Sequence, residues 1–348
     1  MKRSDSINRS ARKLFIASML CAGFAAAAAG WQFLPSQPRT PSLQQQIDAL
    51  PRANGTGMHE SAEGGIISLR NPNDPRQRVI KIDKPIRLPS CVALDGGGTK
   101  IIYTGPADRA AIELASTRPD GYYFGHQSAP TIANLHIVSS GRGIGFDASV
   151  KGNSEYLTIE NVSISAAGDA IDLRPPSGGC YATRLVNVNV YRLGAAALYY
   201  YGNTITIDGL RVCYGTRDGF KPPPAYINLR GITGGGGSVR DVHVEAFDSG
   251  RRESVTPIRI EDGSWTLLQG HLEQPGPSPA VVVRGKDTVA SFVNPGWYTG
   301  VGVLVQDGAR VDVQSAYPIP DNFFQRDARS EICVNGAKRG VVATHETR

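Results

Sequence analysis

Short runs of alternating apolar and polar residues, bounded by Gly, Asn, Asp or Pro, fill most of the chain between residues 43 and 320. Alternation with period two over such short segments is typical of β-strands with one buried side. One run, an Asn-like residue followed by apolar–any–apolar, recurs about every 27 residues. Its copies are Asn134–Ile137, Asn161–Ile164, Asn187–Val190, Gly209–Val212, Asp241–Val244 and, in degenerate form, Gln269–Leu272.

A second alternating strand follows each copy after a Gly-rich turn, for example at Ile144–Phe146, Ile171–Leu173 and Ile227–Leu229. No helical segment separates these strands, which excludes βαβ units, and a propeller blade would need about 40–45 residues. Short strands that stack on their counterparts at about 4.8 Å form a parallel β-helix. The recurrent Asn is then expected at a buried corner, with its amide turned inward and bonded to its counterparts.

Composition agrees with a turn-rich β protein. The 348 residues include 40 Gly and 23 Pro, and only 20% are charged. A hydrophobic share of 41% excludes a wholly disordered chain. The net charge is +6, but residues 1–30 contribute +4 of it. The remaining chain is nearly neutral, so we expect no nucleic-acid partner.

The N-terminus has the pattern of a secretory signal. A basic stretch ending at Lys13 precedes residues 14–30, which carry no charge and close with five alanines. Residues 1–30 are therefore predicted to be a signal peptide, or alternatively an uncleaved membrane anchor and the chain's only contact with a membrane. Residues 31–42 are predicted to be a linker. The protein is expected to be exported to the periplasm, the cell surface or the medium.

Export affects the interpretation of the cysteines. Cys91, Cys180, Cys213 and Cys333 could form two disulfides in an oxidising compartment, with three alternative pairings, or could remain isolated thiols. Their spacing does not match a structural zinc site.

Several segments carry a resemblance to a known family. Gln46–Leu50 is similar to a short capping helix, Gly64–Leu69 to a first strand, and Ile86–Gly98 to first coils. Together with the repeat, they make residues 43–320 resemble the right-handed parallel β-helix proteins of the pectate lyase superfamily, in particular its tailspike and pectate-lyase-like branch. The resemblance implies an all-β, single-stranded right-handed parallel β-helix with a short N-terminal capping helix. Residues 321–348 would form a C-terminal cap or tail, and because several relatives trimerise the oligomeric state is left open.

The alternation predicts one chemically rich outward face. If Ile171 and Leu173 point inward, Asp172 and Arg174 point outward. Arginine suits carboxylates, tyrosine suits sugar rings, and carboxylates suit acid/base work or Ca²⁺. An ordinary ion pair between Arg230 and Glu261 is the structural alternative. The face carries Asp172, Arg174, Tyr199, Tyr201, Asn228, Arg230, Arg259 and Glu261, and the preceding turns add Asp169, Arg217, Asp218 and Lys221.

The resemblance implies activity on a polysaccharide, and this face favours a lyase that cleaves a uronate-containing, acidic glycan. Arg230 or Arg259 would neutralise the sugar carboxylate, and Lys221 or an arginine would remove the C5 proton. Tyr199 or Tyr201 would protonate the leaving oxygen, while Glu261 and Asp172 would orient these groups or hold Ca²⁺. The substrate-binding set would be Arg174, Asn228, Arg217, Asp218 and Asp169.

Incomplete family signatures keep other functions open. Gly168–Leu173 resembles the polygalacturonase segment, but Ala170 replaces its second acid. The acidic triplet and the arginine signature of pectate lyases are not evident. The alternatives are a glycoside hydrolase with Asp172 and Glu261 as acid and base, a uronate epimerase, or a non-catalytic glycan-binding or envelope-structural β-helix. The polysaccharide could be acidic or neutral, and a metal is left open.

A second outward column follows the Asn positions. It places His243 beside His271 and Glu245 beside Glu273, one repeat apart. Two imidazoles and two carboxylates at that spacing could supply a base, an acid or a metal site. The alternative is an ordinary polar surface on a solvated sheet.

Overall fold

The computed structural model describes residues 41–50, 65–70, 78–90, 92–116, 121, 123–124, 131–245, 255–273, 278–298 and 302–338. Leu43–Arg348 forms one compact unit, divided from Met1–Ser42. The predicted signal, nearly all of the predicted linker, and Cys91 lie outside the described residues. Within the described ranges, no helix has the length and apolar character needed to cross a membrane.

The unit is nearly all β, as the alternating pattern predicts. Its helical elements among the described residues are α2 (Leu43–Asp48) and the 3-10 turn η2 (Asp321–Phe323). The early strands are β1 (Gly65–Ser68), β2 (Val79–Ile82), β3 (Ile86–Pro89), β4 (Val92–Tyr103), β5 (Ala110–Ala115), β6 (Tyr123–Phe124), β7 (Thr131–Ser139), β8 (Arg142–Phe146), β9 (Ser154–Glu155), β10 (Thr158–Ala166), β11 (Ile171–Leu173) and β12 (Cys180–Tyr181). The later strands are β13 (Thr183–Leu193), β14 (Leu198–Thr216), β15 (Ala225–Glu245), β16 (Thr256–Glu273), β17 (Val281–Val293), β18 (Gly296–Tyr298), β19 (Val303–Gln306), β20 (Arg310–Gln314), β21 (Phe324–Arg326), β22 (Glu331–Val334) and β23 (Ala337–Lys338).

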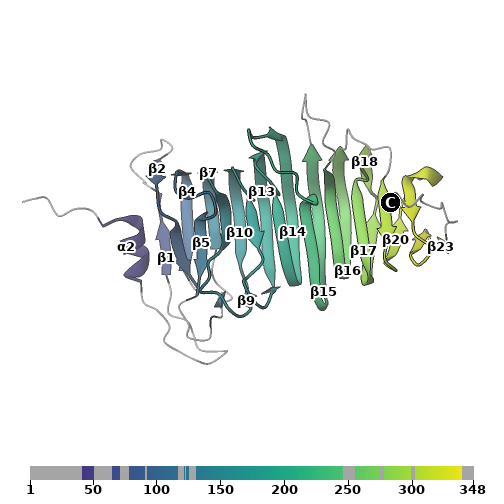
Figure 1. Cartoon of the computed structure of the whole chain (residues 1–348), viewed down its shortest axis with the longest axis horizontal. Coiled ribbons are helices and arrows are strands. Elements are labelled where there is room, and N and C mark those ends of the chain that lie inside the picture. The colour runs from purple at the N-terminus through teal and green to yellow at the C-terminus, as the bar shows by residue number, and fades with distance from the viewer. Residues whose placement is uncertain are drawn as a thin grey trace, which may run out of the picture. The chain divides into compact units, whose positions relative to one another are not determined.

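Strands one repeat apart pair in parallel. β10 pairs with β7 on one side and with β13 on the other, and the series continues through β14, β15, β16 and β17. Among the described strands, β22 with β23 is the one antiparallel pair. Figure 1 shows the strands following one another along the unit from β1, next to α2, to β23 at the opposite end. We call one repeat of this stack a rung.

The core consists of stacked apolar columns. In one column, Ile137, Ile164, Val190, Val212, Val244 and Leu272 are in register on successive rungs, and all are buried. Burying each such side chain contributes roughly 1.5–3 kcal/mol. The repeat stacks like residue on like residue, so the 27-residue period of the sequence becomes the core of the unit.

The Asn positions differ from expectation. Asn134, Asn161 and Asn187 are exposed, so the predicted buried corner was wrong. Their side chains do bond along the stack, since Asn161 Nδ2 donates to Asn134 Oδ1 (3.3 Å) and Asn187 Nδ2 donates to Asn161 Oδ1 (2.8 Å). All three have φ near +50°, a left-handed conformation that Asn tolerates better than most residues. The backbone conformation of the turn therefore explains the recurrent Asn.

The N-terminal end of the stack is covered by α2, where a capping helix was predicted. Ile47 is buried against the core. Gln44 bonds to the exposed edge of β3 twice, donating from Nε2 to the Arg87 carbonyl (3.1 Å) and accepting the Arg87 N–H at Oε1 (2.9 Å). A side-chain amide thus satisfies one backbone donor and one acceptor that an open sheet end leaves unpaired.

At the other end, parallel pairing continues past residue 320, where the sequence pattern placed the end of the repeat. β21 pairs with β19, and β22 pairs with β20. The hairpin from β22 to β23 then ends the parallel series with an antiparallel pair. The segment predicted as a separate cap therefore adds two further parallel strands to the stack.

Candidate functional site

The strand register places the predicted outward residues in two columns. Asp172, Tyr199, Asn228, Arg259 and Val282 occupy matching positions on β11, β14, β15, β16 and β17. Tyr201, Arg230, Glu261 and Arg284 form the second column. This is the alignment that the repeat predicted, because parallel pairing at a fixed period sets equivalent residues side by side. We call this surface, from β11 to β17, the paired face.

A compact charge cluster occupies the β11 end of the paired face. Arg174 donates from Nε to Asp172 Oδ1 (2.7 Å), and Arg142 donates from Nη1 to Asp172 Oδ2 (3.2 Å). The same Arg174 lies 3.6 Å from Asp169 Oδ2. Asp172 lies in the predicted outward column, but the two guanidinium groups cover it and leave it only 7% exposed.

Two tyrosines continue the face on β14. The Arg174 guanidinium lies over the Tyr199 ring, with Cζ 3.7 Å from its centroid. The Arg230 guanidinium lies 5.4 Å from the centroid of Tyr201. Both contacts are within cation–π range and restrict the movement of the arginines. Tyr199 and Tyr201 therefore lie on the predicted face, and each ring has an arginine beside it.

A second network covers the β16–β17 end of the face. Glu261 accepts from Arg259 Nε (2.9 Å) and lies 3.4 Å from Arg284 Nε. Arg284 also pairs with Asp307 (3.1 Å). The Arg230–Glu261 pair, the structural alternative considered for this face, is not formed. Arg230 instead pairs with Asp262 Oδ2 at 3.1 Å, because Glu261 is already bound to its own neighbours.

Burial sets the titration of two groups in the cluster. The pKa of Asp169 is raised, first by burial and also by the charge of Asp172, while the N–H of Ala196 bonded to Oδ1 and the two arginines oppose the rise. The pKa of Tyr199 is raised by burial and by Asp169, against the opposing charge of Arg174. Asp169 therefore holds a proton more readily than an ordinary aspartate, next to a carboxylate bound by two arginines.

The turn residues predicted for binding are more dispersed. Arg217 donates from Nη1 to the Ser139 carbonyl (2.8 Å), and Asn228 donates from Nδ2 to the Ala225 carbonyl (2.6 Å). Both side chains thus hold backbone in place. Asp218 and Lys221 are exposed, and neither forms an ion pair within the described part of the chain.

Sequence reasoning missed Arg142 and Asp262. Arg142 was not among the residues predicted for the site, yet it contacts Asp172 from the preceding rung. The usable signal was an Arg at the start of β8 and an Asp within β11, two strands that the repeat sets side by side. Asp262 follows the aligned strand segment and was left outside the column comparison. Its pairing depends on how the chain bends after β16 residue Glu261, where the register with β17 shifts.

The strand register also tests the outward column that follows the Asn positions. His243 pairs in register with His271 and Glu245 with Glu273, as predicted. The imidazoles are stacked, with centroids 5.6 Å apart. His243 Nε2 lies 3.0 Å from Asp241 Oδ1, and His271 Nε2 lies 2.9 Å from Glu273 Oε1. Across the described residues, no group of three or more His, Cys, Asp or Glu side chains is arranged to hold a metal ion, on this face or elsewhere.

Three cysteines lie within the described residues, and all are free thiols. Cys180 is buried, and burial raises its pKa while its thiol donates to the Leu173 carbonyl (3.3 Å). Cys213 is half-buried and Cys333 is buried. None of the predicted pairings among these three is formed, and Cys91 lies outside the described residues.

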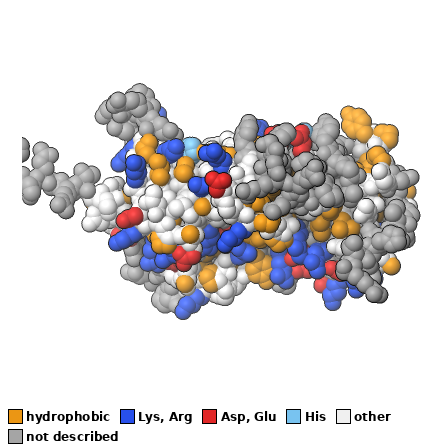
Figure 2. All heavy atoms as spheres, turned by 45° about the horizontal axis from the view of Figure 1, so that its top comes forward, with side chains coloured by type: hydrophobic (Ala, Val, Ile, Leu, Met, Phe, Trp, Pro, Cys, Tyr) orange, Lys and Arg blue, Asp and Glu red, His pale blue; other side chains and the backbone are white. Residues whose placement is uncertain are grey.

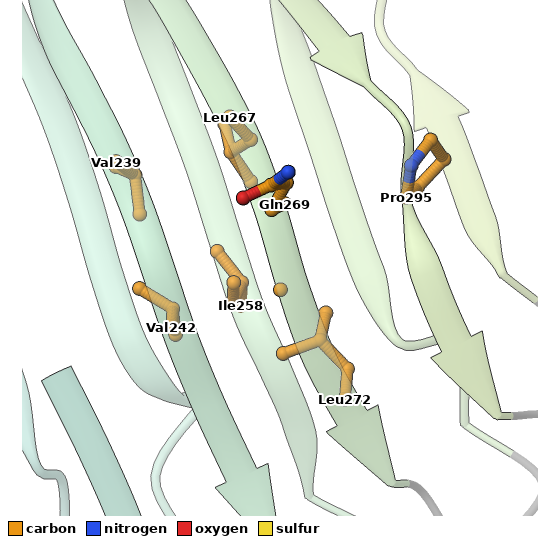
Figure 3. Close-up of a pocket in the computed structure, with 8 residues that line it drawn as sticks. Val239, Val242, Ile258, Leu267, Gln269, Leu272 and Pro295 are labelled. Atoms are coloured by element: carbon orange, nitrogen blue, oxygen red, sulfur yellow. The ribbon is translucent and has the colours of Figure 1, made fainter. Parts of the chain in front are cut away.

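An apolar gap lies away from this chemistry, between β15, β16 and Pro295. Gly270 occupies the inward position that Val242 holds on the preceding rung, so a side chain is missing from the core column. Figure 3 shows the lining side chains around the gap, with Pro295 on the opposite side from Val239 and Val242. The degenerate copy of the repeat thus produces a packing defect rather than a binding site.

Comparison of the chain with protein-family models, with curated proteins and with solved structures gives no match. The interpretation of the paired face therefore depends on its own geometry.

Proposed function

We propose that the protein is an exported right-handed parallel β-helix, similar to the pectate lyase superfamily, that binds a polysaccharide along the paired face and cleaves it. The parallel stack of short rungs supports this fold, and the predicted signal in residues 1–30 supports export. The observation that carries the function is the pair of carboxylates at Asp169 and Asp172, both in contact with Arg174, next to Tyr199.

The two carboxylates are suited to different tasks. Asp169 is 18% exposed at its side chain and has a raised pKa, which suits a general acid that protonates a glycosidic oxygen. Asp172 accepts hydrogen bonds from Arg142 and Arg174, which hold its carboxylate in place. A fixed negative charge there stabilises an oxocarbenium-like transition state. Two neighbouring carboxylates in different environments are typical of glycoside hydrolysis.

Elimination on a uronate-containing glycan is the second candidate. It is favoured by the number of guanidinium groups on the face and by the position of Tyr199 between Arg174 and Arg259, whose charges oppose the rise in its pKa. Arg230 or Arg259 would neutralise the sugar carboxylate, Lys221 or an arginine would take the C5 proton, and Tyr199 or Tyr201 would protonate the leaving oxygen. The substrate carboxylate would then have to displace Glu261 or Asp262 from its arginine.

A product assay separates these chemistries. The full chain is incubated with a panel of neutral and acidic glycans, and reducing ends and the absorbance of unsaturated uronate are both followed. New reducing ends without absorbance support hydrolysis, and absorbance supports elimination. Binding without either signal would refute cleavage and leave a glycan-binding protein.

Two variants link the activity to the cluster. Asp169→Asn keeps the acceptor for the Ala196 N–H but has no proton to donate at the raised pKa, so we expect a loss of about 10²–10⁴-fold in kcat. Asp208→Asn is the matched control, because Asp208 pairs with Arg240 away from this face. Equal losses in the two variants would place the reaction elsewhere.

A further inference from the structure

We infer that the glycan bound by the paired face is uncharged where it contacts the protein; this inference rests on the proposed function and narrows its substrate class. An arginine-rich face first suggests an anionic ligand. The arrangement of partners points the other way.

Each guanidinium of the face is already paired. Arg174 contacts Asp172 and Asp169, Arg230 contacts Asp262, and Arg259 contacts Glu261. The ion-paired residues of the face between the turn before β11 and the end of β17 balance: four arginines stand against four carboxylates. They are Arg174, Arg230, Arg259 and Arg284 with Asp169, Asp172, Glu261 and Asp262. Beyond these strands, Arg142 adds a contact to Asp172, and Asp307 pairs with both Arg284 and Arg329.

A carboxylate on the ligand would meet these acids at close range. Any group within reach of Arg174 lies near both Asp169 and Asp172, which are 3.6 Å and 2.7 Å from that arginine. Like charges brought together at a binding surface oppose association. Bidentate recognition would also require donors that Asp172 and Glu261 now occupy.

Among the described residues of the adjoining turn, Arg217 and Lys221 lie outside these ion pairs, and Arg217 is held by the Ser139 carbonyl. Lys221 is exposed on the adjoining turn, where Asp218 is exposed as well. Figure 2 shows acidic side chains beside basic ones at several places on the visible part of the unit. A surface of this kind suits hydroxyl groups, which donate to carboxylates, accept from guanidinium groups and carry no charge.

Glycan binding by the full chain tests the inference. Neutral oligosaccharides and uronate oligosaccharides of matched length are compared by calorimetry at low and high salt. We expect the neutral ligands to bind at least tenfold more tightly than the uronates, with affinity that changes less than twofold between the two salt concentrations. Tighter, salt-sensitive binding of uronates would overturn the inference and leave the proposed function standing. No binding and no cleavage of either class would overturn both.

One substitution is expected to create the missing property. Glu261→Gln removes the carboxylate that Arg259 and Arg284 share, on a side chain that is partly exposed. The variant should gain at least fivefold affinity for the uronate ligands at low salt. Asp312→Asn, which frees Arg310 away from the paired face, is the matched control and should gain none. Equal gains in both variants, or none in Glu261→Gln, would show that pairing does not exclude the acidic ligand.

Discussion

Substitutions at Asn161 test why each rung begins with an Asn-like residue. Asn161 has φ of +52°, is exposed, and takes part in the side-chain bonds to Asn134 and Asn187. Asn161→Gly and Asn161→Ala both remove those bonds. They differ in the backbone, because glycine adopts positive φ freely and alanine does not. Comparing the two variants therefore separates the ladder of amides from the conformation of the turn.

The magnitudes follow from the two terms. Each lost hydrogen bond costs about 0.5–1.5 kcal/mol, and this applies to both variants. Forcing a residue with a Cβ into the left-handed region costs about 1–2 kcal/mol more, which applies to alanine only. The greater unfolded-state entropy of glycine offsets part of that difference, roughly 0.5–1 kcal/mol. We therefore expect both variants to be less stable than the parent, with Asn161→Ala below Asn161→Gly by about 1 kcal/mol.

Urea unfolding of the full chain measures these differences through the midpoint at unchanged slope. Asn189 provides the matched control, because it lies within strand β13, two residues after Asn187, and does not have a positive φ. There the order should reverse, with glycine less stable than alanine, since glycine weakens a strand interior. If Asn161→Ala were as stable as Asn161→Gly, the backbone explanation for the repeat would be refuted.

Four further predictions concern the core and the cluster. Gly270→Ala should raise the unfolding free energy by about 0.5–1 kcal/mol by filling the gap, whereas Gly236→Ala should destabilise, because its Cβ would lie 1.6 Å from the Ser264 carbonyl. Cleavage should decline as the pH rises through the raised pKa of Asp169; a flat pH profile would contradict its role as the acid. Because the pKa of Asp169 is raised in the folded state, its contribution to stability is greatest below the ordinary aspartate pKa and is lost as the pH rises through the folded-state pKa. At neutral pH, Asp169→Asn should therefore unfold at a higher urea concentration than the parent. Arg142→Met removes the ion pair with Asp172 and should lower kcat on the order of 10²-fold with KM little changed. Recovery of kcat in Arg142→Lys but not in Arg142→Gln would confirm that Arg142 positions Asp172 through its charge.

Much of the fold could be predicted from the chain alone because the repeat determines both the pairing of the strands and the side chains that they bury. A period of 27 residues sets which strands become neighbours, and alternation sets which side chains are buried, as in the column from Ile137 to Leu272. The register of Asp172 with Tyr199 and of Arg230 with Glu261 followed from the same two facts. The exposure of the recurrent Asn residues could not be predicted in this way. Asn occurs both as a polar core residue and as a left-handed turn residue, and only the backbone angle φ distinguishes the two.

The candidate site shows the opposite balance. The residue types of the paired face are evident in the sequence, but their partners are not, since an arginine side chain reaches across a rung as easily as along its own strand. Arg142 and Arg174 both reach Asp172 and cover it. Arg230 pairs with Asp262 and not with Glu261, its neighbour in the register. Alternation along the strands was enough to set which side chains face outward together. Which charges remain available to a ligand depended on side-chain reach in three dimensions, and that reach pairs the described arginines in the two columns of this face with carboxylates.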